Sequence, residues 1–133
     1  MIGSMKLRNR IVLPPMARGY ATPEGLATRQ TIDHYASIAR GGVGLVIIEA
    51  TFVHPAGRGW HNPLGVHNDQ CIAGLATLAE SVHDGGSKIA LQLFHAGRET
   101  SSSYFGMQVV APSSIPSPGL DVPVSLPRQN AKN

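Results

Sequence analysis

The chain has 133 residues, with 11 Lys and Arg against 8 Asp and Glu, a net charge of +3 and a pI near 9.4. Its 42% hydrophobic content can build the core of one soluble unit, and its basic residues are scattered, which argues against a nucleic-acid surface. No run of about 18 apolar residues spans a membrane, and a single cysteine excludes an internal disulfide and a cysteine metal cluster.

Three apolar runs predict β-strands. The first covers Asn9 to Met16 and breaks at Pro14 and Pro15, because proline cannot continue a central ladder. The second, Val43 to Val53, is almost continuously apolar, which is typical of a parallel strand covered on both faces. The third runs from Lys88 to Phe94.

The gap before the second strand carries helical periodicity. Its apolar residues recur three and four positions apart, at Ile32, Tyr35, Ala36 and Ala39. Thr28 or Thr31 can cap the start of this helix, and Gly41 is placed to stop it.

The gap before the third strand repeats the pattern, at Ile72, Leu75, Ala76, Ala79 and Val82. Asn68 or Asp69 can cap this second helix, and Gly85 can take the left-handed conformation that ends it. The predicted order is therefore β-α-β-α-β. Parallel strands joined by helical crossovers predict an α/β fold with ligand sites at the carboxyl ends of the strands.

The unusual residues gather at those ends. They are Pro15, Met16 and Ala17 after the first strand, Glu49 and Ala50 near the end of the second, and Gln92 and His95 near the end of the third. Gln92 is a lone amide in an apolar strand, and leaving a buried amide unpaired costs about 1 to 3 kcal/mol. It is either a core amide bonded to neighbouring backbone or a ligand contact. Alternation puts Ala90 beside Gln92 on one face, and a small residue beside an amide suits a flat ligand.

Four motifs carry a family resemblance. They are Asn9-Arg-Ile-Val-Leu-Pro-Pro-Met16, Gly41-Gly-Val-Gly-Leu-Val-Ile-Ile-Glu-Ala50, the stretch from Asp84 through Gln92 to Arg98, and Ala111-Pro-Ser-Ser-Ile115. In this order and spacing the chain resembles the old yellow enzyme family, the NADH:flavin oxidoreductases and ene-reductases, which are FMN-bound TIM barrels.

The resemblance implies a cofactor site and a function. The cofactor-binding positions it implies are Pro14, Pro15, Met16, Ala17, Ala50 and Gln92. Gln92 would hydrogen-bond the pyrimidine edge of the flavin, so it would tune the cofactor without acting as an acid or base. The implied activity is hydride transfer from NAD(P)H through FMN to an activated alkene or similar small-molecule acceptor.

Length conflicts with a whole barrel, which typically needs about 250 residues and eight strands. The prediction is a partial TIM (β/α)8 barrel, with residues 1–133 as an amino-terminal fragment and 112–133 as an extended, Pro-rich tail. The family's substrate-anchoring pair, proton-donating Tyr and phosphate-gripping loops fall outside it, so no catalytic residue is predicted. The alternative function is a non-catalytic fragment or assembly subunit, and self-association or a chain carrying the rest of the barrel is the expected partnership.

The remaining candidates favour structural roles. His54, His61 and His67 are too widely spaced to predict a metal site, and Gly41 to Gly44 follows a helix, the reverse of a dinucleotide fingerprint. Arg98 could hold an anion or donate to loop carbonyls. No membrane or nucleic-acid partner is expected, and without a signal-peptide pattern the expected location is the cytoplasm.

Overall fold

The computed structural model describes residues 2–126. The main elements are β1 (Val12–Leu13), α1 (Arg29–Arg40), β2 (Leu45–Phe52), α2 (Gln70–Asp84) and β3 (Lys88–Phe94). Between and after them come two 3-10 turns, η1 (Pro55–Gly57) and η2 (Ser102–Tyr104), and two short strands, β4 (Val110–Ala111) and β5 (Val124–Ser125). The predicted order β-α-β-α-β is confirmed, and none of the helices described is long and apolar enough to cross a membrane.

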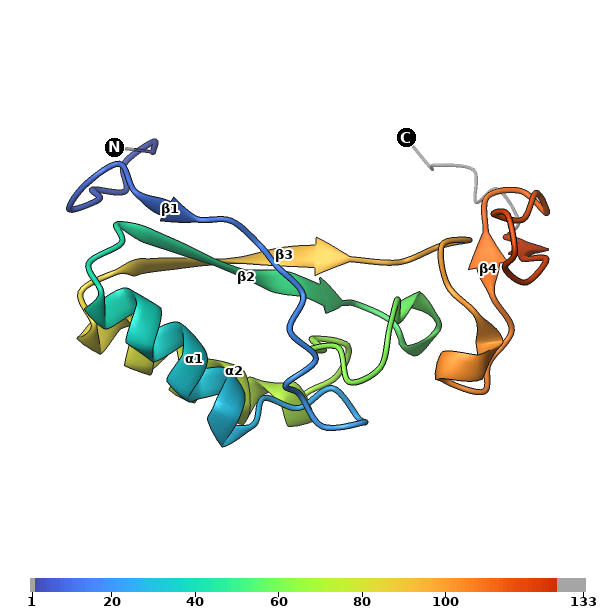
Figure 1. Ribbon diagram of the computed structural model, residues 1–133, viewed down its shortest axis with the longest axis horizontal. Coiled ribbons are helices and arrows are strands. Elements are labelled where there is room, and N and C mark those ends of the chain that lie inside the picture. The colour runs from blue at the N-terminus through green and yellow to red at the C-terminus, as the bar shows by residue number, and fades with distance from the viewer. Residues whose placement is uncertain (1, 127–133) are drawn as a thin grey trace.

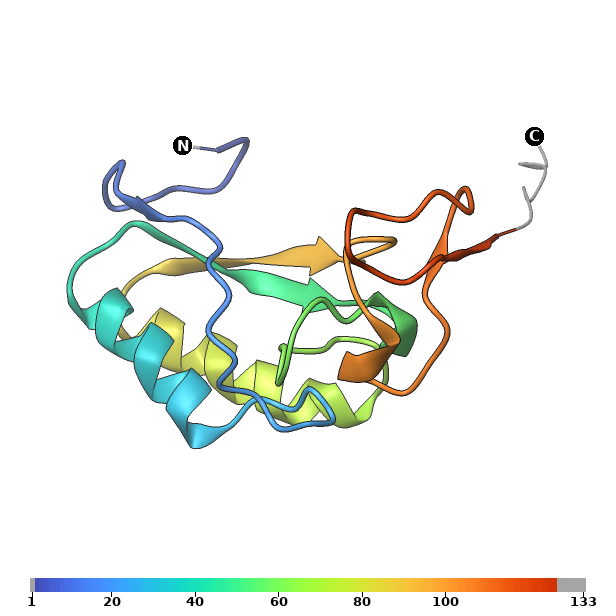
Figure 2. The same cartoon turned by 45° about the vertical axis from the view of Figure 1, so that its right-hand side comes forward.

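One parallel sheet of order β1-β2-β3 forms the centre of the molecule. Figures 1 and 2 show α1 and α2 together on one side of this sheet. Helix α1 packs against β2 and helix α2 against β3, and Val46 and Ile48 of β2 are buried in one core cluster with Tyr35, Leu78 and Val82. Among the described residues, no helix covers the opposite face of the sheet (Figures 1 and 2).

The first strand is shorter than predicted, because only Val12 and Leu13 pair with β2. Asn9 lies just before it, and its side chain accepts a hydrogen bond from Ile11 N at 3.0 Å and donates to Gly42 O at 2.7 Å. Ile11 O still accepts hydrogen bonds from Gly44 N at 2.8 Å and Leu45 N at 3.3 Å, and after Leu13 the two prolines end the strand because they lack the N–H groups that pairing needs.

Helix α1 begins as predicted, with Thr28 as cap and Thr31 closing a reciprocal capping box. At the start of α2 the cap hydrogen bond comes from Asn68, whose Oδ1 accepts from Gln70 N at 3.0 Å. The prediction for the end of α2 was wrong. Gly85 has φ −71°, and the left-handed residue is Gly86, at φ +80°.

The apolar face of α2 also differs from the prediction. Cys71, Leu78 and Val82 are buried, whereas Ile72 is 61% exposed and Ala76 is exposed too. The helix touches β3 and α1 only on part of its apolar surface, so its remaining apolar residues face outward.

The segment after β3 lies beyond the carboxyl ends of β2 and β3, in orange to red in Figure 2. It is not uniformly irregular as predicted, because β4 and β5 form a small parallel pair, with Val110 opposite Val124. Residues 127–133 of the predicted tail lie outside the described residues.

Gly25 provides a test of how the loop before α1 packs on β2. Its φ is +93°, and an added Cβ would lie 2.7 Å from the ring of Phe52, which is fully buried. Replacing Gly25 by Ala should cost about 1–2 kcal/mol for the backbone conformation and about 1–3 kcal/mol more for the overlap.

The matched control is Gly42→Ala, because Gly42 has φ +104° and open space around its Cβ position. We expect Gly25→Ala to lower the free energy of unfolding in urea more than Gly42→Ala does. Equal losses in the two variants would show that the Phe52 ring yields to the added methyl group.

Candidate functional site

The carboxyl ends of the three parallel strands bring the predicted site residues together. The segment Pro14 to Ala17 directly follows β1, and Ala50 of β2 is the register partner of Gln92 of β3. Neighbouring register partners in a sheet point to the same face, so Ala50 and Gln92 share a surface. The structure therefore places all six predicted residues at one end of the sheet.

Gln92 faces away from the helices. On β3, Ile89 and Leu91 pack against the core, whereas Ala90 and Gln92 alternate with them and are exposed. The prediction that the Gln92 amide is buried is therefore wrong. Its side chain is exposed and makes no hydrogen bond among residues 2–126. Its two donors and its acceptor are available to a ligand or to further strands over this face.

The segment after β1 also presents free polar groups. Met16 is 40% exposed and Ala17 is exposed, and neither backbone N–H has a hydrogen-bond partner among the described residues. Unpaired N–H groups next to a small side chain can approach a flat, polar ligand closely. This segment presents donors after β1, and Gln92 presents an amide on β3, with β2 between them in the sheet.

A buried carboxyl lies behind this surface, at Glu49, which is 1% exposed. Its Oε2 accepts from Arg18 N at 2.8 Å, and its Oε1 accepts from the Tyr35 hydroxyl at 3.4 Å. The same hydroxyl accepts from Glu49 N at 3.0 Å. Burial raises the pKa of Glu49, and the Arg18 and Gly19 amides, the Tyr35 hydroxyl and the Arg18 charge oppose that rise.

The sequence placed Glu49 among the unusual residues near the strand ends but did not indicate which groups it contacts. A carboxyl-bearing residue inside a fully apolar run is itself a signal, because an unpaired buried charge is too costly to persist. The partner residues, Tyr35 and Arg18, come from two other segments, and nothing in their local sequence connects them to Glu49.

The loop after β2 is held by aromatic packing. The rings of Phe52 and His67 stack with centroids 4.6 Å apart, and the Arg58 guanidinium lies 4.8 Å from the Phe52 centroid. The ring of Trp60 packs on that of Phe94, with centroids 5.4 Å apart. These contacts fix the loop against Phe52, the last residue of β2.

The histidines do not form a metal site. Among residues 2–126 no group of three potential ligands could hold a metal ion. His54 instead lies near His95, with centroids 6.4 Å apart, and the pKa of His95 is lowered by burial and by the charge of His54. Arg98 is paired with Glu99 at 3.5 Å on the surface, and whether it holds an anion or donates to loop carbonyls stays a prediction.

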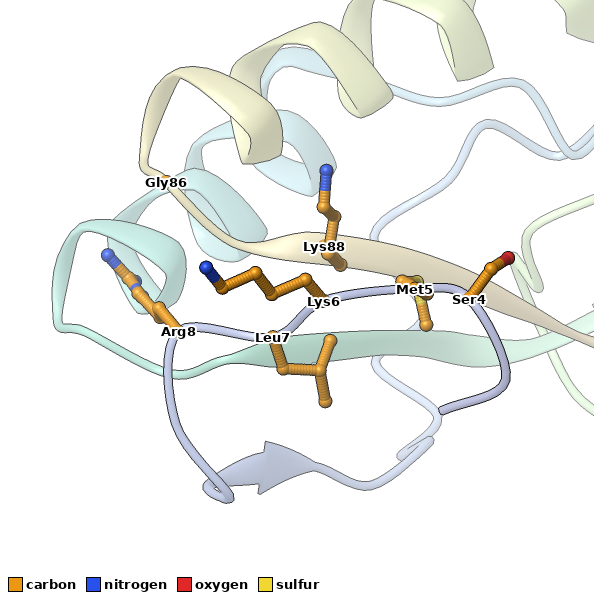
Figure 3. A pocket seen from close by; sticks show the side chains of 7 residues that line it. All are labelled: Ser4, Met5, Lys6, Leu7, Arg8, Gly86 and Lys88. Carbon is orange, nitrogen blue, oxygen red and sulfur yellow. The ribbon is translucent and has the colours of Figure 1, made fainter. Parts of the chain in front are cut away.

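A second hollow lies at the opposite, amino-terminal end of the strands, where Lys6, Arg8 and Lys88 gather (Figure 3). The Arg8 guanidinium is already engaged, because its Nε donates to Val43 O at 2.9 Å and its Nη2 to Ser87 Oγ at 3.1 Å. The Arg8 Nη2 also donates to Ala39 O at 2.5 Å, so Arg8 ties the end of α1 to Ser87, the residue just before β3. The two lysines are exposed, so this hollow is a solvated basic surface.

Comparison with known proteins identifies the family. A family profile described as NADH:flavin oxidoreductase / NADH oxidase matches residues 1–129. The chain belongs to this family. The membership that its four motifs predicted is confirmed, and flavin and NADH, which the resemblance implied, appear in the description of the family.

Two relatives show how much of such a flavin oxidoreductase the chain represents. It is 45% identical over 117 residues to the NADH oxidase of Thermoanaerobacter brockii, which covers 86% of this chain and 18% of that protein. It is 42% identical over 111 residues to the NADPH dehydrogenase of Listeria monocytogenes, covering 83% of this chain and 32% of that protein. The chain therefore spans less than a third of either relative.

Solved structures of the family match the fold. An old yellow enzyme homologue from Zymomonas mobilis superposes with a TM-score of 0.87 at 34% identity, over 95% of this chain and 38% of that one. Morphinone reductase superposes with a TM-score of 0.85 at 32% identity, over 95% and 38%. The arrangement of β1, β2 and β3 with α1 and α2 is therefore that of the corresponding part of these proteins.

The residues present fit the flavin that the family description names. A planar ring with a polar edge needs a small, flat surface and hydrogen-bond donors along one side. Ala50 and Ala90 supply the small side chains, and the unbonded Gln92 amide and the free amides of Met16 and Ala17 supply the donors.

Proposed function

We propose that this chain is the amino-terminal part of an FMN-binding TIM barrel, in an NAD(P)H:flavin oxidoreductase of the old yellow enzyme type. The observation that carries the proposal is the pairing of Ala50 with Gln92 beside the free amides of Met16 and Ala17. FMN bound there would supply the hydride chemistry, taking hydride from NAD(P)H for delivery to an activated alkene or similar acceptor.

The residues of this chain would bind the FMN ring and adjust its reduction potential. Pro14 and Pro15 restrict the backbone after β1, which holds the amides of Met16 and Ala17 in place. Ala50 leaves room for close approach of a ring, and Gln92 donates to its polar edge. A fixed donor favours the negative charge that a flavin gains on reduction. None of these side chains titrates, so none acts as a proton donor.

The uncovered face of the sheet indicates that further strands must pack against this chain. Val12, which alternates with the core-facing Leu13, is 40% exposed, and both edge strands, β1 and β3, lack an outer partner among the described residues. Apolar surface of this kind needs covering strands. We propose that the remaining barrel strands supply them, whether they belong to a longer chain or to a partner chain, with self-association as the competing outcome.

A chimera tests the proposed function. Residues 1–129 of this chain would replace the matching segment of the Listeria monocytogenes NADPH dehydrogenase. We expect the purified chimera to be yellow, to release FMN on denaturation and to oxidise NADPH. The parent dehydrogenase is the control. A chimera with native-like circular dichroism that stays colourless in excess FMN would contradict the proposal.

A further inference from the structure

The Glu49 carboxyl is the one fully buried carboxyl among the described residues, and the proposed function gives it no role. It lies on β2 next to Ala50 in sequence, yet its side chain turns toward α1 and the loop after β1. Two structural features account for this position, a bulge in β2 and a set of hydrogen bonds to Arg18 and Tyr35.

The bulge is visible in the strand register. Ile48 pairs with Leu91 and Ala50 pairs with Gln92, which are consecutive residues of β3. Glu49 is therefore an extra residue of β2 without a partner of its own, which defines a β-bulge. In an unbroken register Glu49 would be the partner of Gln92 and would point to the same face. The extra residue therefore removes a carboxylate from the surface that carries Gln92 and puts a methyl group there.

The hydrogen bonds connect the carboxyl to the segment after β1. Arg18 N donates to Oε2 at 2.8 Å, and the amide of Gly19 also faces the carboxyl. These amides immediately follow Ala17. The Tyr35 hydroxyl accepts from Glu49 N and donates to Oε1, which holds the carboxyl from the α1 side.

We propose that Glu49 is a positioning residue for the flavin site: its carboxylate anchors the segment Pro14 to Ala17 through the Arg18 amide, and the bulge keeps its charge off the face of Gln92. The inference rests on the proposed function for its ligand. The anchoring itself depends only on contacts within the chain, so the two can be tested separately.

The charged and titratable groups around Glu49 are few. Tyr35 faces it from α1, Arg18 faces it from the loop, and the ring of His34 lies 4.9 Å from that of Tyr35. Burial raises the pKa of Tyr35, so its hydroxyl stays protonated, and burial lowers the pKa of His34, so His34 is neutral at neutral pH. His34 can also gain a proton as pH falls further, so the comparison with Glu49→Gln is what assigns a titration to the Glu49 carboxyl.

Because the pKa of Glu49 is raised on folding, the protonated form is favoured in the folded state. This group contributes stability below its ordinary pKa, and that contribution is lost as pH rises through the raised value. The anchoring amides report the same event, since an N–H bonded to a carboxylate changes its chemical shift when the carboxylate is protonated.

The test is amide NMR on the full 133-residue chain. We expect the Arg18 and Gly19 amide shifts to titrate together, with an apparent pKa above the ordinary glutamate value of 4.5. In Glu49→Gln the titration should vanish while exchange protection of both amides is largely kept. In Glu49→Met, which lacks an acceptor, exchange of these amides should become roughly tenfold to a hundredfold faster.

The α1 amides of each variant provide the folding control. If the α1 amides of Glu49→Met also lose exchange protection, that variant is unfolded. The inference is then tested by the titration of the wild-type amides and by its absence in Glu49→Gln. Wild-type Arg18 and Gly19 shifts that do not titrate, or that titrate unchanged in Glu49→Gln, would overturn the inference.

Adding FMN at millimolar concentration separates the two proposals. We expect shift changes at Ala17 and Gln92, with a weaker apparent affinity in Glu49→Met and near wild-type affinity in Glu49→Gln. Anchoring with no FMN response at either residue would refute the flavin site and leave the anchor standing. An FMN response equal in all three proteins would refute the positioning role and leave the flavin site standing.

Discussion

The isolated 133-residue chain is expected to bind FMN roughly a hundredfold to ten-thousandfold more weakly than the chimera with the remaining barrel strands. The described site offers contacts for a ring, from Ala50, Gln92 and the amides of Met16 and Ala17. TIM barrels commonly hold a phosphate in the loops after their last two strands. Losing two charged hydrogen bonds there removes about 3 to 6 kcal/mol, which gives this range.

Fluorescence quenching of the flavin measures this affinity, on a sample shown to be monomeric by sedimentation. Riboflavin, which lacks the phosphate, is the control ligand. The isolated chain should bind riboflavin and FMN about equally, whereas the chimera should prefer FMN strongly. Submicromolar binding of FMN by the monomer, or a large preference for FMN over riboflavin, would place a phosphate site within this chain.

Replacing Gln92 by Leu in the FMN-loaded chimera should lower the two-electron potential of the flavin by about 30 to 60 mV. A donor that favours the reduced, negatively charged ring is lost, and hydrogen bonds to charged groups contribute about 1.5–3 kcal/mol, with 30 mV equal to about 1.4 kcal/mol. Flavin retention should fall as well. Potentiometry of the loaded variant gives the shift directly.

The control is Gln30→Leu, because Gln30 is an exposed amide on α1, away from the site. Its potential should stay at the wild-type value. A core amide at Gln92 would behave differently, since the variant would then melt at a lower temperature and keep its flavin potential. In the isolated chain Gln92 is exposed and unbonded, so its replacement should leave the melting temperature there nearly unchanged.

Local sequence was sufficient where the deciding interactions are local. The cap of α1 involves Thr28 and Thr31, three residues apart, so composition and spacing predicted it. The parallel order of the strands followed from their length and from the helices between them. The four motifs determined the family, the strand ends placed Pro15 to Ala17, Ala50 and Gln92 at one edge of the sheet, and the resemblance added Pro14 to the candidate site.

Tertiary structure decided the features that depend on distant neighbours. The end of α2 shows this on a small scale, because a Cβ on Gly85 would lie 2.7 Å from that of Ala39. Gly85 is therefore required by helix packing, and the left-handed turn falls on Gly86.

At the site, too, features set by local sequence were predicted and features set by distant contacts were not. The sequence by itself determined which residues lie at the strand ends, because strand boundaries follow from local apolar runs and prolines. Only the fold decided that a bulge places Ala50 opposite Gln92, and that Glu49 meets an amide 31 positions away. Only the fold decided, too, that Gln92 is exposed in residues 2–126, because burial of a strand face depends on which other segments cover it.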